Sequence, residues 1–104
     1  NAFNGRVLYR RAAVNMALRR YADAVGDCDR VLQRLPHYNK ALIRRAHAQQ
    51  AVGKLAEALA DLERVYAGAP TPSLLSEIKA LRSKARRSID DAMPRAVMAN
   101  NVEY

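Results

Sequence analysis

The spacing of apolar residues along the chain predicts helices, because these residues recur every three to four positions rather than every second position. The first predicted helix carries the apolar residues Val7, Leu8, Ala12 and Val14. The pattern resets around residues 19–20. The second predicted helix then carries the apolar residues Tyr21, Ala24, Val25, Cys28, Val31, Leu32 and Leu35. Pro36 ends this helix, because proline lacks the backbone N–H that a continuing helix would use.

The same arrangement recurs further along the chain. A helix is expected from Ala41 to Val52, a break at Gly53 and a second helix from Leu55 to about Ala67, before a stop at Pro70. Eleven of the 32 positions from 5 to 36 hold the same residue as the position 34 further on. A fixed period of this length is typical of stacked helical repeats.

Small residues explain how the two helices of each unit pack together. Alanines at equivalent places in both units, namely Ala12, Ala24, Ala46 and Ala58, are expected to allow close approach of the helices. Gly53 suits a left-handed backbone at the break between the helices of the second unit. The first unit has Arg19 there, which should cost roughly 1 kcal/mol if the same conformation is required.

A longer helix is expected over residues 72–93. Thr71 is placed to cap it, and Pro72 would occupy the first helical position. One apolar stripe follows the predicted helix, formed by Leu74, Ile78, Leu81, Ala85, Ile89 and Ala92. Such a helix would cover the last unit and leave its other face in water. Pro94 is expected to end or kink it, and residues 95–104 show no clear period.

The charge of the chain narrows the class of partner. Lys and Arg outnumber Asp and Glu by 18 to 10, a formal net charge of +8, which favours acidic partners. The chain has no run of about 18 apolar residues, so no membrane span is expected. Cys28 lies on an apolar stripe, so we expect it to be a core residue. It is the single cysteine of the chain and cannot form an internal disulfide, which favours a reducing, cytoplasmic compartment.

These residues resemble the tetratricopeptide repeat (TPR) family over positions 5–70. The matching positions, all in register, are Leu8 and Leu42, Ala12 and Ala46, Tyr21, Ala24 and Ala58, Gly53, and Pro36 and Pro70. The family's usual aromatic late in the first helix is replaced by Asn15 and Gln49, and its small residue late in the second helix by Val31 and Val65. The resemblance implies an all-α, right-handed α-solenoid within one domain: a repeat over 5–38, a repeat over 39–70, a capping helix over 72–93 and a tail over 94–104.

A narrower resemblance is to the co-chaperone branch of that family, in which a carboxylate clamp holds the C-terminal tails of heat-shock 70 and heat-shock 90 chaperones. Lys40 and Arg44 fall on two of the clamp positions, and Arg10 stands where the branch usually has an asparagine. Two further clamp residues would belong to an earlier repeat. The region also resembles the repeats of J-domain co-chaperones, and residues 101–104 could be the approach to a J domain.

Helical spacing places the candidate site residues on one wall. Lys40 and Arg44 share a helix face, and Arg6 and Arg10 hold the equivalent places one period earlier. His47 lies one turn further along. Arginine can grip a carboxylate with two parallel hydrogen bonds and lysine adds a point charge, so the wall suits an acidic peptide with roughly micromolar affinity. The expected function is therefore the docking of acidic chaperone tails.

Several alternatives remain open. The chain could be a generic scaffold for another protein complex. The basic stretch from Lys79 to Arg87 could bind nucleic acid, although aromatic residues for stacking are scarce. The open face of the first helix could pack on a second copy to form a homodimer. No nucleophile motif, phosphate loop, paired carboxylates or metal-ligand spacing occurs, so neither an enzyme nor a cofactor or metal is expected.

Overall fold

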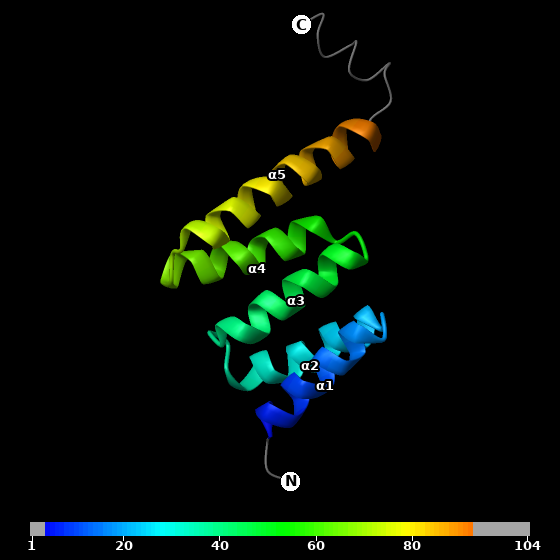
Figure 1. Ribbon diagram of the computed structural model, residues 1–104, viewed down its shortest axis with the longest axis vertical. Helices are drawn as coiled ribbons and strands as arrows, with labels where there is room; N and C mark the ends of the chain where they lie inside the picture. Colours follow the sequence, from blue (N-terminus) through cyan, green and yellow to red (C-terminus); the bar gives the residue numbers. More distant parts are fainter. Residues whose placement is uncertain (1–3, 93–104) are drawn as a thin grey trace, which may run out of the picture.

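Five helices follow one another along the chain in a computed structural model that describes residues 4–92. They are α1 (Gly5–Ala17), α2 (Tyr21–Arg34), α3 (Asn39–Ala51), α4 (Leu55–Gly68) and α5 (Pro72–Ala92). Figure 1 shows them stacked in sequence order, with α5 lying along α4 at one end and the α1–α2 pair at the other. The described part of the chain contains no strand. The all-α helical-repeat fold expected from the sequence is confirmed.

The ends of the helices have local chemical causes. The side chain of Asn4 caps α1 by accepting a hydrogen bond from the Val7 N–H at 3.1 Å. Thr71 caps α5 in the same way, because its Oγ1 accepts from the Leu74 N–H at 3.1 Å while Pro72 is the first helical residue, as predicted. The predicted end or kink at Pro94 and the whole tail 94–104, with the J-domain approach at 101–104, lie outside the described residues.

The turns inside the two helix pairs share one backbone conformation. Gly53 has a φ of 83°, and Arg19 at the equivalent place has a φ of 60°. In both turns the following N–H reaches back to the helix at 2.8 Å, from Arg20 to the Asn15 carbonyl and from Lys54 to the Gln49 carbonyl. Arg19 therefore does occupy the left-handed region, in which a side chain is disfavoured by about 1 kcal/mol.

The core runs between successive helices in two clusters. The larger cluster joins α2, α3, α4 and α5 and includes the fully buried Leu42 and Leu62. The smaller one joins α1, α2 and α3. The four alanines expected at the close contacts, Ala12, Ala24, Ala46 and Ala58, are all completely buried. Each pair of helices therefore packs closely at a methyl group, with larger side chains filling the space beside it.

The apolar residues of α1 do not form one buried stripe. Ala12 is fully buried and Leu8 packs against the larger cluster, whereas Val7 is 55% and Val14 56% exposed. Leu35, at the end of α2, is also exposed. The reason is the position of α1 in the stack: α2 and α3 cover one side of it, and no described helix covers the other.

Candidate functional site

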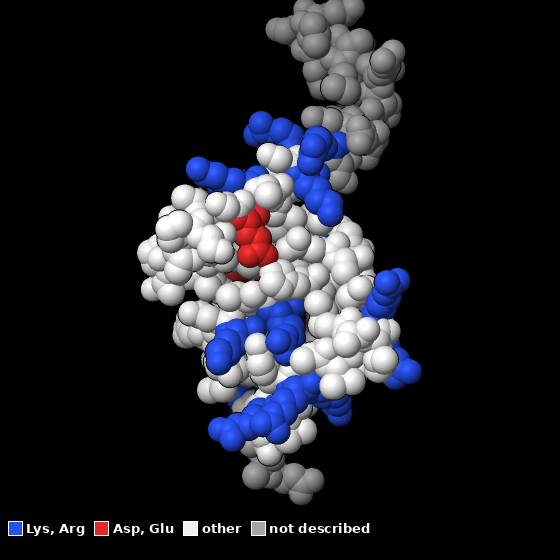
Figure 2. Space-filling model, viewed as in Figure 1, with Lys and Arg blue, Asp and Glu red and all other residues white. Residues whose placement is uncertain are grey.

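Basic side chains gather on α1 and α3. Arg6, Arg10 and Lys40 are exposed, and Arg44 is half-buried. Figure 2 shows basic residues over the region of these two helices and again around α5, with an acidic patch between the two groups. Among residues 4–92, no ion pair or hydrogen bond engages the side chains of Arg6, Arg10 or Lys40. These three charges are therefore available to a ligand.

Arg44 is held in place by the neighbouring helix. Its Nη1 donates to the backbone carbonyl of Tyr9 in α1 at 3.1 Å, and its Cζ lies 4.0 Å from the centre of the Tyr9 ring. The Tyr9 and Tyr38 rings form an edge-to-face pair, with 6.0 Å between their centres and 65° between their planes. A guanidinium over an aromatic face is stabilised by the ring quadrupole, and one hydrogen bond leaves four of its five N–H groups unused. Arg44 is thus fixed in orientation yet still able to donate.

The contact between Arg44 and Tyr9 places the two basic helices side by side. Because Tyr9 precedes Arg10 in α1, this contact brings the backbone beside Arg10 next to α3. The structure also gives the two equivalent arginines different surroundings, since Arg44 packs on a helix before it and Arg10 is exposed.

His47 has a partner that the sequence did not indicate. Its Nε2 lies 2.6 Å from Oε1 of Glu77 in α5, and both side chains remain partly exposed. The basic wall therefore ends at an acidic side chain on the capping helix. These residues are 30 positions apart, on two helices that both pack against α4, so no local pattern could have revealed Glu77.

A cleft opens beside the wall, where the starts of α3 and α5 meet the end of α4. Its volume is about 320 Å³, and its lining includes the apolar residues Ile43, Val65 and Leu74 with Asn39 and Glu77. Asn39 and Ile43 are the sequence neighbours of Lys40 and Arg44. The structure therefore adds a partly apolar recess to a surface that the sequence presented as purely basic.

Two other arginines on the same helices stabilise the fold instead. Arg11 binds Oδ1 of the buried Asp27 through Nε and Nη2, at 3.0 and 2.6 Å. Arg45 binds both carboxylate oxygens of Asp61 at 2.8 and 2.7 Å and also reaches Asp29 at 2.8 Å. Hydrogen bonding to Asp61 raises the pKa of Arg45. These contacts hold Arg11 and Arg45 against acidic side chains of α2 and α4 and make them part of the helix packing.

Cys28 of α2 is a buried free thiol. Burial raises the pKa of the Cys28 thiol to about 11, so it is protonated and shielded at neutral pH. In the part of the chain that the structure describes, no group of three His, Cys, Asp or Glu side chains could hold a metal ion. No helix within 4–92 has the length and apolar character needed to cross a membrane.

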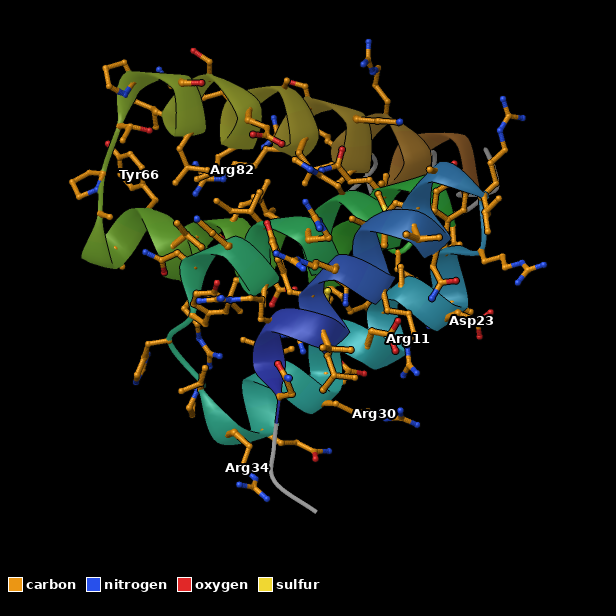
Figure 3. All side chains as sticks on the ribbon, turned by 60° about the horizontal axis from the view of Figure 1, so that its bottom comes forward. Arg11, Asp23, Arg30, Arg34, Tyr66 and Arg82 are labelled. Carbon is orange, nitrogen blue, oxygen red and sulfur yellow. The ribbon has the colours of Figure 1, made fainter. Side chains whose placement is uncertain are left out.

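The basic face of α5 is a second charged surface. Lys79, Lys84, Arg86 and Arg87 are exposed, whereas Arg82 forms an ion pair with Glu63 of α4 at 2.5 Å. Figure 3 shows Arg82 extending from α5 toward α4. These exposed charges belong to α5, whereas the basic wall belongs to α1 and α3, so the two surfaces can be tested separately by substitution.

Comparisons with known proteins identify the fold family. No protein-family model matches the chain, and no curated protein matches its sequence. A solved structure of the first TPR of Spaghetti (RPAP3), bound to the HSP90 peptide SRMEEVD, is 30% identical over 80% of this chain and 67% of that chain, with a TM-score of 0.74. The NMR structure of the first TPR domain of human RPAP3 is 30% identical over 88% of this chain and 72% of that chain, with a TM-score of 0.76. The chain therefore belongs to the tetratricopeptide repeat family.

Proposed function

We propose that the wall formed by α1 and α3 docks the acidic carboxyl-terminal tail of a heat-shock chaperone, and that the chain is a non-enzymatic, cytoplasmic module of a co-chaperone. The observation that carries this proposal is the pairing of Lys40, free of any partner in residues 4–92, with Arg44, which Tyr9 holds in a fixed orientation. The solved relative with a bound HSP90 peptide supports the heat-shock 90 class as the first partner to test.

The chemistry of the wall fits a terminal carboxylate. Arg44 can donate two parallel N–H groups to one carboxylate, and Lys40 supplies a compact positive charge four residues before it. Each charge-assisted hydrogen bond contributes roughly 1.5–3 kcal/mol. After the cost of ordering a flexible peptide, two or three such bonds correspond to about −8 kcal/mol, a micromolar complex.

His47 and Glu77 give the wall a direction. A carboxylate on Glu77 repels an acidic side chain placed beside it, and His47 is already engaged with that carboxylate. The acidic end of the tail is therefore proposed to lie at Lys40, with Arg10 and Arg6 beyond. A residue without negative charge then lies at His47, and an apolar side chain fits the recess lined by Ile43.

Fluorescence polarisation with the labelled peptide SRMEEVD and its C-terminally amidated twin tests the proposal. Micromolar binding that weakens at least about tenfold on amidation is expected, because amidation removes the charge that Lys40 and Arg44 bind. Equal binding of the two peptides, or no binding of either, would reject the carboxylate clamp. The chain would then remain a TPR scaffold for another protein complex.

Single substitutions locate the site. Lys40→Ala and Arg44→Ala should each weaken peptide binding about tenfold or more, whereas Lys84→Ala on α5 removes one charge outside the site and should change it less than about twofold. Arg10→Ala should have a smaller effect than Arg44→Ala, because Arg10 has no aromatic support. An equal loss from Lys84→Ala would show that net charge, rather than the wall, drives binding.

A second function rests on the exposed basic face of α5. Lys84 and Arg86 could contact phosphates, as nucleic-acid-binding surfaces do. This second function predicts that the chain binds a nucleic-acid duplex with an affinity that falls steeply between low and physiological salt. Lys84→Ala should lower this affinity, and Lys40→Ala should leave it unchanged. We also propose that the co-chaperone is a J-domain protein, because these repeats resemble those of J-domain co-chaperones.

A further inference from the structure

The two sides of α3 face different neighbours. Arg44 contacts α1, where its Nη1 donates to the Tyr9 carbonyl at 3.1 Å. Ile43, the residue before it, lines the cleft described above together with residues of α4 and α5. Lys40 stands one turn before Arg44 on the same helix. The basic part of the candidate site and the cleft therefore lie on adjoining sides of α3.

The cleft combines an apolar lining with an acidic group. Ile43, Val65 and Leu74 supply apolar side chains to a volume of about 320 Å³. Within residues 4–92, Glu77 of α5 is the one charged residue of the lining. Its side chain is 37% exposed, so a ligand can reach the carboxylate. A side chain that enters the cleft therefore meets an apolar surface and a negative charge.

The partner of Glu77 does not remove this negative charge. Nε2 of His47 lies 2.6 Å from Oε1 of Glu77. A neutral imidazole donates one N–H to a carboxylate and leaves the charge of the carboxylate in place. The two oxygens of a carboxylate can also accept further hydrogen bonds. Glu77 can therefore receive a cation from a ligand while it holds His47. Figure 2 shows acidic side chains between the basic residues over α1 and α3 and those around α5.

We propose that the cleft binds a lysine or arginine side chain of the docked tail, and that Glu77 is the residue that selects it. This inference rests on the proposed docking of an acidic tail at Lys40 and Arg44. The methylene stem of the basic residue covers Ile43 and Leu74, and its cationic head meets Glu77. A purely apolar side chain fills the same cleft but brings no opposite charge to Glu77, and an acidic side chain is repelled.

The width of α3 sets the place of the basic residue in the tail. An α-helix with its side chains is about 10–12 Å wide, and an extended chain advances about 3.3–3.6 Å per residue. Passing from Arg44 across α3 to the cleft takes about three residues by the shortest line and about five around the helix surface. The partner is therefore an acidic tail with a basic residue about three to five positions before its terminal carboxylate.

Fluorescence polarisation with two labelled peptides tests the proposal. SRMEEVD carries an arginine five positions before its terminal aspartate, and SQMEEVD has an uncharged glutamine there. The native chain should bind SRMEEVD at least about threefold more tightly than SQMEEVD, and Glu77→Gln should reduce this ratio to less than about 1.5-fold. Glu57→Gln is the matched control and should keep the native ratio, because it removes the same charge from an exposed position on α4. Equal ratios in the native chain and in Glu77→Gln would overturn the proposal.

A charge reversal at the same position measures a larger change. Glu77→Lys should favour SEMEEVD, which has a glutamate in place of the arginine. The ratio of the affinities for SEMEEVD and SRMEEVD should be at least about tenfold higher in Glu77→Lys than in Glu57→Lys, which adds the same charge outside the cleft. An equal ratio in the two variants would overturn the proposal, because only the net charge of the chain would then matter.

Amidation of the peptide separates this proposal from the docking on which it rests. The native chain and Glu77→Gln should both lose at least about tenfold in affinity on amidation, which shows that the variant is folded and still binds the terminal carboxylate. A loss on amidation combined with equal binding of SRMEEVD and SQMEEVD to the native chain would overturn the role of the cleft and leave the docking of the tail in place. Absence of binding to every peptide would overturn both.

Discussion

The two helix pairs share one repeat pattern but differ in their surroundings. The α3–α4 pair lies between α2 and α5, and its apolar positions are closed on both sides. The α1–α2 pair has a described neighbour only on the side of α3. Equivalent residues consequently differ in burial, as Val14 and Ala48 do, and in ion pairing, as Arg11 and Arg45 do. A repeat pattern therefore specifies helices and turns, while the neighbours in the stack decide what each residue contributes to stability.

The largest effect is expected at Leu62, whose equivalent in the first helix pair is Cys28. Both side chains are fully buried and lie one period apart. Leu62→Ala should reduce the free energy of unfolding by about 2–5 kcal/mol, because it leaves a cavity among α3, α4 and α5. Cys28→Ala removes one atom and should cost about 1 kcal/mol. Chemical denaturation measures both, and a larger loss from Cys28→Ala would contradict the view that the second pair forms the main core.

A larger side chain should destabilise the chain at a covered position of the second helix pair but not at the equivalent exposed position of the first. Ala48→Leu must fit a larger side chain between packed helices and should cost about 1–3 kcal/mol. Val14→Leu at the equivalent exposed place should change stability by less than about 0.5 kcal/mol. Thermal unfolding compares the two variants. Similar losses would show that the outer side of α1 is already covered in solution.

High pH should destabilise the chain through Cys28, a titratable core residue of the first pair whose equivalent in the second pair is Leu62. Burial raises the pKa of the thiol from its ordinary 9.0 to about 11. The folded state thus keeps a proton that the unfolded state loses above pH 9, so stability is complete below pH 9 and is lost toward pH 11. By pH 10 the loss should be about 1 kcal/mol. Denaturation curves at pH 8 and pH 10 should show this loss in the native chain and not in Cys28→Ala.

The smallest effect concerns the turn that both pairs share. Arg19→Gly should stabilise the chain by up to about 1 kcal/mol, because glycine adopts a positive φ without the steric cost of a side chain. Gly53→Ala should destabilise it by about the same amount. A shift of about 4–8 °C in melting temperature per kcal/mol makes both visible. Two changes of the same sign would mean that the turns differ in solution.

Local features of the chain could be predicted from its sequence, because their causes lie within one period. Arg19 and Gly53 marked the same turn, Thr71 and Pro72 marked the start of α5, and buried alanines such as Ala46 marked the close contacts. Each depends on backbone conformation or side-chain size at a single position. These features can be inferred from the sequence without knowing how the helices stack.

Features of the candidate site that depend on stacking could not be predicted in the same way. The support of Arg44 by Tyr9 joins residues 35 positions apart, and the pair of His47 with Glu77 joins two helices separated by α4. The exposure of Val7 depends on what lies beside α1, which the periodicity of the chain does not encode. Identical spacing thus predicted a uniform basic wall, whereas packing supports one arginine and places an acid at one end.

The bridge made by Arg45 has a consequence for how the molecule opens. This guanidinium joins carboxylates from both helix pairs at once, Asp29 on one side and Asp61 on the other. If one pair unfolded alone, Arg45 would lose half of its partners while remaining close to the other pair. In a linear array, such a shared contact couples neighbours and suppresses partial unfolding. Backbone amides of α2 and α3 are then expected to exchange with solvent through one common opening event. The contact between the two helix pairs would thus make two short repeats behave as a single cooperative unit.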